Sequence, residues 1–203
     1  MEQRNNRNNN RGRNEQRNEQ PKRRRRVNID KNVEVIVANN SFYHFIYDNP
    51  RINTSFDLQN WGDEEYITVG ELRTMVNASR KIFEGFTLLI IEILDDEYTL
   101  EDLLTYLGLD NKYEEYFKMI PNKRDKRASV ADIRTFIEKS TTERFKQVLS
   151  GMDERLRGTV IETALTLFKT QNFGDYNKMQ VIRELTHDDI FLDAEETEVD
   201  VHI

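Results

Sequence analysis

The feature that most constrains the fold is a segment, residues 42–94, in which short runs of aromatic and β-branched residues alternate with turn residues. Short runs of this kind, bounded by Gly, Pro, Asn or Asp, are typical of β-strands. The sequence Thr-Val-Gly-Glu, which begins at Thr68, interrupts the runs and is a capping box, typical of a helix start. The segment therefore predicts a small sheet with a helix packed against it.

Three antiparallel strands are expected ahead of this helix. Residues 33–38 and 42–47 are rich in β-branched and aromatic side chains, and the Asn-Asn-Ser between them favours a turn because asparagine tolerates left-handed conformations. We therefore predict a hairpin between these two strands. Residues 54–58 supply a third strand of the same meander, and residues 59–66 are expected to form a loop in which Trp61 packs on the sheet.

The helix that begins at Thr68 is expected to end at Gly85, and its apolar residues recur at helical spacing. Residues 86–94 form an apolar run that is too short for a membrane span and is rich in β-branched residues, which predicts a buried strand. Residues 31–120 are therefore expected to form a small α+β domain, a mostly antiparallel sheet with one packed helix. Apolar residues near its end, around Tyr113, are expected to close over the sheet edge.

The second half of the chain predicts a C-terminal helical bundle at residues 129–187. Four short amphipathic segments with brief connections follow one another there, which is typical of a bundle. Residues 121–128 contain a proline and a run of charged residues, so we predict a linker between the two domains.

The two ends of the chain carry opposite charge. The first 26 residues contain ten Lys or Arg and three Glu and, apart from Met1, no large apolar side chain. Burial cannot offset the entropy of ordering such a segment, so residues 1–30 are expected to form a disordered basic arm. Residues 188–203 contain seven Asp or Glu and no Lys or Arg, and form a predicted acidic tail.

The arm is a candidate contact for nucleic acid or for an acidic partner surface, because guanidinium groups suit phosphate and carboxylate recognition. The alternatives are a solubilising arm and an arm that docks on the acidic surface of its own chain. The candidate binding residues are Arg4, Arg7, Arg11, Arg13, Arg17, Lys22, Arg23, Arg24, Arg25 and Arg26.

The acidic tail contains an apolar triplet, Ile190, Phe191 and Leu192, that a purely solvating tail does not need. We interpret this triplet as a docking element for a groove on a partner, or as part of a segment that pairs with a basic arm. The alternative is a frayed tail without a binding role.

Signatures of common catalytic chemistry are absent from the sequence. It contains no phosphate-binding glycine loop, no H-E-x-x-H zinc helix, no G-x-S-x-G nucleophile turn and no cysteine. The acidic cluster of residues 63–65 does not match the spacing of a calcium loop. We therefore expect a non-enzymatic protein without cofactor or metal. The sequence also shows no secretory signal and no membrane span, so we expect an intracellular protein without membrane contact.

The front half, residues 33–120, resembles structural and assembly proteins of tailed bacteriophages. The stretches that carry the resemblance are VEVIVANNS, FYHFIY, WGDEEYITVGELRTM and KIFEGFTLLIIEIL. The resemblance implies a bacteriophage virion or assembly component that is made in the host cytoplasm, has a place in the virion and works through contacts with other virion or assembly proteins. It assigns no functional residue.

Two functions remain as expectations from the sequence. The first is the virion structural or assembly protein, in which the arm contacts nucleic acid or an acidic partner and oppositely charged ends favour a homo-oligomer. The alternative is a nucleic-acid-binding regulatory protein that uses the arginine-rich arm to recognise RNA or DNA. A regulator prefers one sequence or RNA shape over its competitors, whereas a structural anchor does not.

Overall fold

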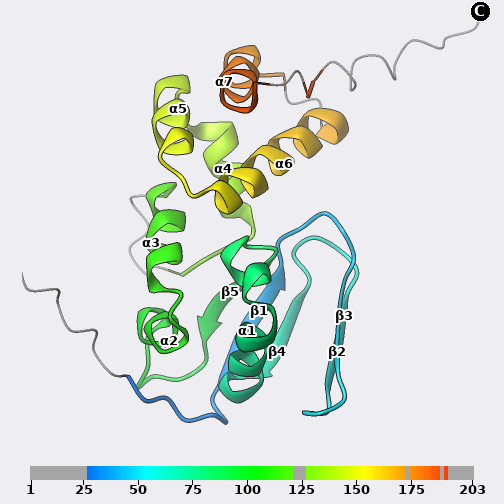
Figure 1. The fold of residues 1–203 in the computed structure, drawn as a ribbon, viewed down its shortest axis with the longest axis vertical. Helices are drawn as coiled ribbons and strands as arrows, with labels where there is room; N and C mark the ends of the chain where they lie inside the picture. The colour runs from blue at the N-terminus through cyan, green and yellow to red at the C-terminus, as the bar shows by residue number, and fades with distance from the viewer. Residues whose placement is uncertain (1–26, 121–126, 172–173, 188–189, 192–203) are drawn as a thin grey trace, which may run out of the picture.

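The computed structural model describes residues 27–120, 127–171, 174–187 and 190–191, which form an α+β fold (Figure 1). Small antiparallel sheets and one helix come first along the chain, and the other helices follow. The fold class predicted from the sequence is therefore confirmed. Within these described ranges, no helix combines the length and the hydrophobicity needed to cross a membrane.

Within the same ranges, the strands are β1 (Glu34–Asn39), β2 (Phe45–Asn49), β3 (Thr54–Leu58), β4 (Glu64–Thr68) and β5 (Leu88–Ile93). The helices are α1 (Val69–Glu84), α2 (Leu100–Leu107), α3 (Asp110–Lys118), α4 (Ala131–Lys139), α5 (Thr142–Ser150), α6 (Glu154–Gln171) and α7 (Tyr176–Thr186).

The central strand of the larger sheet is β1, with β4 antiparallel on one side and β5 antiparallel on the other. Ile36 stands opposite Tyr66 on β4 and opposite Glu92 on β5. All residues of β1 after Glu34 are buried, as expected for a strand that is paired on both edges. Helix α1 packs across this sheet and contacts all three of its strands (Figure 1).

The predicted hairpin between residues 33–38 and 42–47 is wrong, because β2 pairs with β3 in a separate two-stranded ribbon. The side chain of Asn39, which is fully buried, explains the difference. Its Nδ2 donates to the carbonyl oxygens of Tyr43 at 2.8 Å and of Asn60 at 3.2 Å. These bonds hold the segment that follows β1 away from a tight hairpin turn. The two edges of β1 pair with β4 and β5 instead.

Residues 59–63 form the predicted loop, but β4 begins at Glu64, so the prediction is wrong for residues 64–66. Gly62, with φ of 89°, makes the turn into the strand, and pairing with β1 overrides the low strand propensity of its acidic residues. The predicted helix start is confirmed: Thr68 Oγ1 accepts from the Glu71 backbone N–H at 3.2 Å, and Glu71 closes the capping box. Trp61 stacks on Phe42, with ring centroids 5.8 Å apart.

Helix α3 closes over the outer edge of β5, as predicted. The hydroxyl oxygen of Tyr113 accepts the Ile90 backbone N–H at 2.7 Å, so this edge group is satisfied without another strand. Phe86 stacks on Tyr116, with ring centroids 4.9 Å apart, and contacts Tyr113. Phe86 has a left-handed backbone (φ 57°), a conformation that costs roughly 1–2 kcal/mol and is offset here by complete burial of its ring.

The four helices predicted for the second half are confirmed as α4 to α7. Helix α4 packs against α6, and α5 packs against α7. Lys178 of α7 is 3% exposed, and its Nζ donates to the carbonyl oxygen of Ile137 at 2.7 Å, which satisfies a group near the end of α4.

The helical half is joined to the sheet half through a continuous buried core. Thr159 Oγ1 on α6 donates to the carbonyl oxygen of Gly85 at 2.5 Å, and Lys112 Nζ on α3 donates to Asp153 at 2.9 Å. Tyr116 donates to the carbonyl oxygen of Ser129 at 2.9 Å. Because these contacts connect α3 and the end of α1 to α4 and α6, the two predicted domains pack as one body (Figure 1).

The folded part also extends beyond two predicted boundaries. Ile29, within the arm predicted for residues 1–30, is 2% exposed and belongs to the core. Ala128, within the predicted linker, is 1% exposed. The remainder of that linker, residues 121–126, lies outside the described residues.

We expect the substitution Tyr113→Phe to lower the free energy of unfolding by about 1–3 kcal/mol, because it leaves the buried Ile90 N–H without an acceptor. Urea denaturation followed by circular dichroism measures the change. The control is Tyr43→Phe, at a side chain that is 68% exposed, with an expected change below about 0.5 kcal/mol. Equal effects of the two substitutions would contradict the role of Tyr113.

The stability is expected to fall in alkali. Burial raises the pKa of Tyr113 and Tyr116 above the ordinary tyrosine value. Their neutral forms therefore contribute stability that is fully present below the unfolded pKa of about 10 and is lost as the pH rises above it, by up to about 1.4 kcal/mol per pH unit for each tyrosine. Urea denaturation at a series of alkaline pH values should give a shallower decline for Tyr113→Phe than for the unchanged protein.

Candidate functional site

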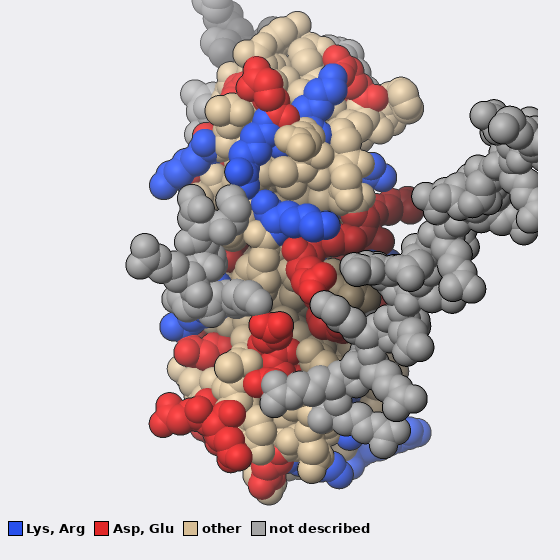
Figure 2. All heavy atoms as spheres, turned by 90° about the vertical axis from the view of Figure 1, so that its left-hand side faces the viewer, with Lys and Arg blue, Asp and Glu red and all other residues tan. Residues whose placement is uncertain are grey.

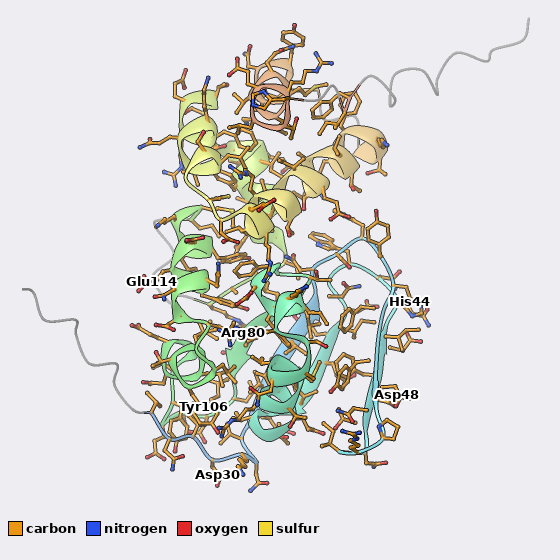
Figure 3. All side chains as sticks on the ribbon, viewed as in Figure 1. Asp30, His44, Asp48, Arg80, Tyr106 and Glu114 are labelled. Carbon is orange, nitrogen blue, oxygen red and sulfur yellow. The ribbon has the colours of Figure 1, made fainter. Side chains whose placement is uncertain are left out.

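A groove of about 420 Å³ between α2 and α3 is the candidate functional site. Its apolar lining comes from both helices and consists of Leu100, Leu104, Tyr113 and Phe117. The charged side chains that line it are Glu101, Asp110, Glu114 and Lys118. Figure 3 shows Glu114 on the outer side of α3, pointing away from the body of the protein.

Local sequence signals set the angle between the two helices. Thr99 caps α2 and forms a capping box with Asp102, as its Oγ1 accepts the Asp102 backbone N–H at 3.2 Å. Gly108 ends α2 with φ of 68°, a left-handed conformation that lets the chain turn directly into α3. Arg80 of α1 holds this turn, since its guanidinium donates to the carbonyl oxygens of Leu107 at 3.2 Å and of Gly108 at 2.5 Å. The groove is therefore built on a braced turn.

The surface around the groove is strongly acidic. Residues 92–115 contain nine Asp or Glu and a single basic residue, Lys112. The Lys112 ammonium is paired with Asp153, the residue before α6, at 2.9 Å. Figure 2 shows mostly acidic side chains over the lower half of this face of the molecule, with a few basic ones at its edges, and a mixture of basic and acidic side chains over the upper half. The groove therefore lies in a field that attracts cations.

Asp110 gives the groove a more specific chemical feature. One of its carboxylate oxygens, Oδ1, is buried and has no hydrogen-bond partner among the described residues. A buried polar atom without a partner is costly, so a donor supplied from outside the described chain would be stabilising there. The exposed carboxylates of Glu101 and Glu114 favour a ligand that carries several N–H donors.

The combination of apolar lining and carboxylates suits a long basic side chain. An arginine or lysine packs its methylene stem on apolar surface while its charged head reaches carboxylates. Arginine fits better, because its planar guanidinium carries five donors and stacks on aromatic rings such as that of Phe117. The groove can therefore bind a basic peptide segment.

Most of the binding residues that the sequence predicts lie outside the described residues. All ten basic residues of the predicted arm lie outside the described residues, as does Leu192. Phe191 is 1% exposed and packs edge-on against Phe168, with ring centroids 5.5 Å apart. The Arg183 guanidinium carbon lies 5.9 Å from the Phe191 ring centroid, and Ile190 packs against the same core. Ile190 and Phe191, the first two residues of the triplet, therefore pack against the helical half of the same chain.

Two other groups singled out by chemistry are not brought together into a site. Glu64 and Glu65 project from successive positions of β4, while Asp63 Oδ2 accepts the Asn60 backbone N–H at 2.7 Å. His44 lies beside Asp57 on the outer side of the ribbon (Figure 3). In the described ranges, no group of three or more potential metal-binding side chains is placed to hold an ion.

The α2–α3 groove was not predicted from the sequence. The signal that could have found it is the acidic run of residues 92–115, which surrounds two leucine- and tyrosine-rich helical segments separated by Gly108. That pattern indicates an acidic surface, but the depression between the helices depends on how they cross.

Phe191→Ala is expected to lower the free energy of unfolding by about 3 kcal/mol, because it removes a buried aromatic ring from the contact with Phe168. Urea denaturation measures the loss. The control is Tyr176→Ala on α7, at a side chain that is 65% exposed, where we expect less than about 0.5 kcal/mol. If Phe191→Ala proves as mild as the control, the seat of Phe191 on α6 is wrong.

Comparison with models of protein families, with curated proteins and with solved structures finds no match for this chain.

Proposed function

We propose that the protein is a non-enzymatic bacteriophage virion structural or assembly protein that works through contacts with other virion or assembly proteins. Its basic arm contacts nucleic acid or an acidic partner surface. The observation that carries this proposal is the separation of charge: an acidic, partly apolar groove is built into the folded body, while residues 1–26 of the same chain have a net charge of +7. Opposite charges on separate parts favour association between copies or with other components.

A further surface supports a role in protein contacts. Large apolar or aromatic side chains remain exposed on the strands and just before β2: Tyr43 at 68%, Ile46 at 64% and Tyr66 at 57%. Aromatic residues are enriched where proteins associate. The resemblance of residues 33–120 to tailed-bacteriophage proteins supports a place in a virion or its assembly, and the charge separation supports a homo-oligomer.

The test is the binding of labelled RNA and DNA, followed by fluorescence anisotropy across a series of salt concentrations. We expect the full chain to bind with an affinity that falls with salt, by roughly 0.7–0.9 in log–log slope for each phosphate neutralised. A variant that lacks residues 1–26 should lose this binding, because ten of the basic residues are removed.

A matched control separates the arm from general positive charge. The variant Lys139→Gln/Lys169→Gln removes two exposed charges from α4 and α6 and should bind like the unchanged protein. Equal binding to unrelated sequences supports a structural anchor, whereas strong preference for one sequence supports the regulatory protein. Absence of binding by the full chain near physiological salt would contradict the nucleic-acid contact.

A further inference from the structure

We propose that the α2–α3 groove is an intramolecular receptor for the basic arm: it binds arginine side chains from Arg23–Arg26 of the same chain, and nucleic acid competes with the groove for them. The competition rests on the proposed function, in which the arm binds nucleic acid. The arm–groove contact itself rests on the geometry and charge of the folded body.

The arm is attached to the folded body beside the groove. Ile29 is buried in the core and fixes the start of the folded chain. The backbone of the next residue, Asp30, lies near the hydroxyl of Tyr98. Tyr98 immediately precedes Thr99, the cap of α2, and Leu100 then lines the groove. In Figure 1 the described chain accordingly begins beside α2, at the end of the molecule where Figure 3 labels Asp30.

The basic cluster of the arm is long enough to reach the groove. An extended chain spans at most about 3.3–3.6 Å per residue, so the four residues Arg23–Arg26 cover about 13–14 Å. Helix α2 has eight residues, which corresponds to a length of about 12 Å. The densest basic cluster of the arm therefore reaches the groove without any change in the folded body. Because the two partners are joined by so short a connection, their effective concentration is in the millimolar range, which favours this arm over the arm of another copy.

The lining of the groove also suits an arginine side chain chemically. The groove offers an apolar floor and two exposed glutamates, Glu101 and Glu114. An arginine supplies a methylene stem for the floor and several N–H donors for the carboxylates. Lys118 is the one basic residue of the lining, so the balance of charge at the groove stays negative.

Binding to the groove would lower the availability of the arm for nucleic acid. When the groove holds the arm, only a fraction of the molecules present it to nucleic acid, and the apparent dissociation constant rises by the inverse of that fraction. Isolated phosphate ligands then compete poorly with the groove for the arm, whereas a dense array of phosphates draws the arm out of the groove. The folded body would thus restrict the arm to concentrated nucleic acid.

The arm–groove contact is tested with a spin label on the full chain. The sequence contains no cysteine, so Gln20→Cys places a single nitroxide next to the basic cluster. We expect paramagnetic broadening of backbone amide signals in α2 and α3, in residues 100–118. The broadening should decrease severalfold in Glu101→Gln/Glu114→Gln, which removes two exposed charges at the groove.

The matched control is Glu143→Gln/Glu162→Gln, which changes the net charge equally at exposed positions of α5 and α6 and should retain the broadening. Mixing spin-labelled protein with isotope-labelled protein that lacks the label distinguishes the source of the arm. Broadening within one chain but not in the mixture supports the proposal. Broadening that is absent, equal over the whole surface or present chiefly in the mixture overturns it.

Nucleic-acid affinity supplies a second readout. We expect Glu101→Gln/Glu114→Gln to bind labelled DNA about three- to tenfold more tightly than Glu143→Gln/Glu162→Gln, because the arm is released from competition. Equal affinities of the two variants would overturn the competition. If no variant binds DNA, the proposed nucleic-acid function fails, while the spin-label result still decides whether the groove holds the arm.

Discussion

The hydrogen bond between the Tyr113 hydroxyl and the Ile90 N–H holds α3 against the sheet, and α3 in turn contacts the helical half. An edge strand carries N–H and carbonyl groups that need partners, and β5 obtains one from a side chain instead of another strand. Burial of that phenol brings α3 against the sheet, where Phe86 and Tyr116 complete the aromatic cluster. Tyr116 then continues the connection to Ser129, at the start of the helical half.

The same cluster also defines the groove. Tyr113 points its hydroxyl at β5 while other atoms of its side chain line the space between α2 and α3. The floor is therefore held by the core, and Arg80 braces the turn at Gly108 from the opposite side. A site built on packed elements keeps its shape before a ligand arrives, which lowers the entropy cost of binding.

Charge is distributed along this chain in blocks of opposite sign. The basic arm and the acidic run of residues 92–115 are far apart in sequence, yet the contact between Tyr98 and Asp30 places the root of the arm beside α2. The acidic tail follows a different principle, since Phe191 is buried against α6 and its ring contributes to the core. The two ends of the chain carry opposite net charge, but the segments next to them are held differently: Asp30 lies beside Tyr98, whereas Phe191 is buried against α6.

The sequence by itself determined the starts and ends of α1 and α2, because the capping boxes at Thr68 and Thr99 and the glycines that end these helices act through neighbouring residues. It also determined the α+β class and the charge blocks. Only the tertiary structure decided that β1 pairs with β4 and β5, that acidic residues form a strand, and that α2 and α3 enclose a groove. Those outcomes depend on hydrogen bonds and burial between residues distant in sequence, such as the bond from Asn39 to Asn60, and local propensity carries no information about them.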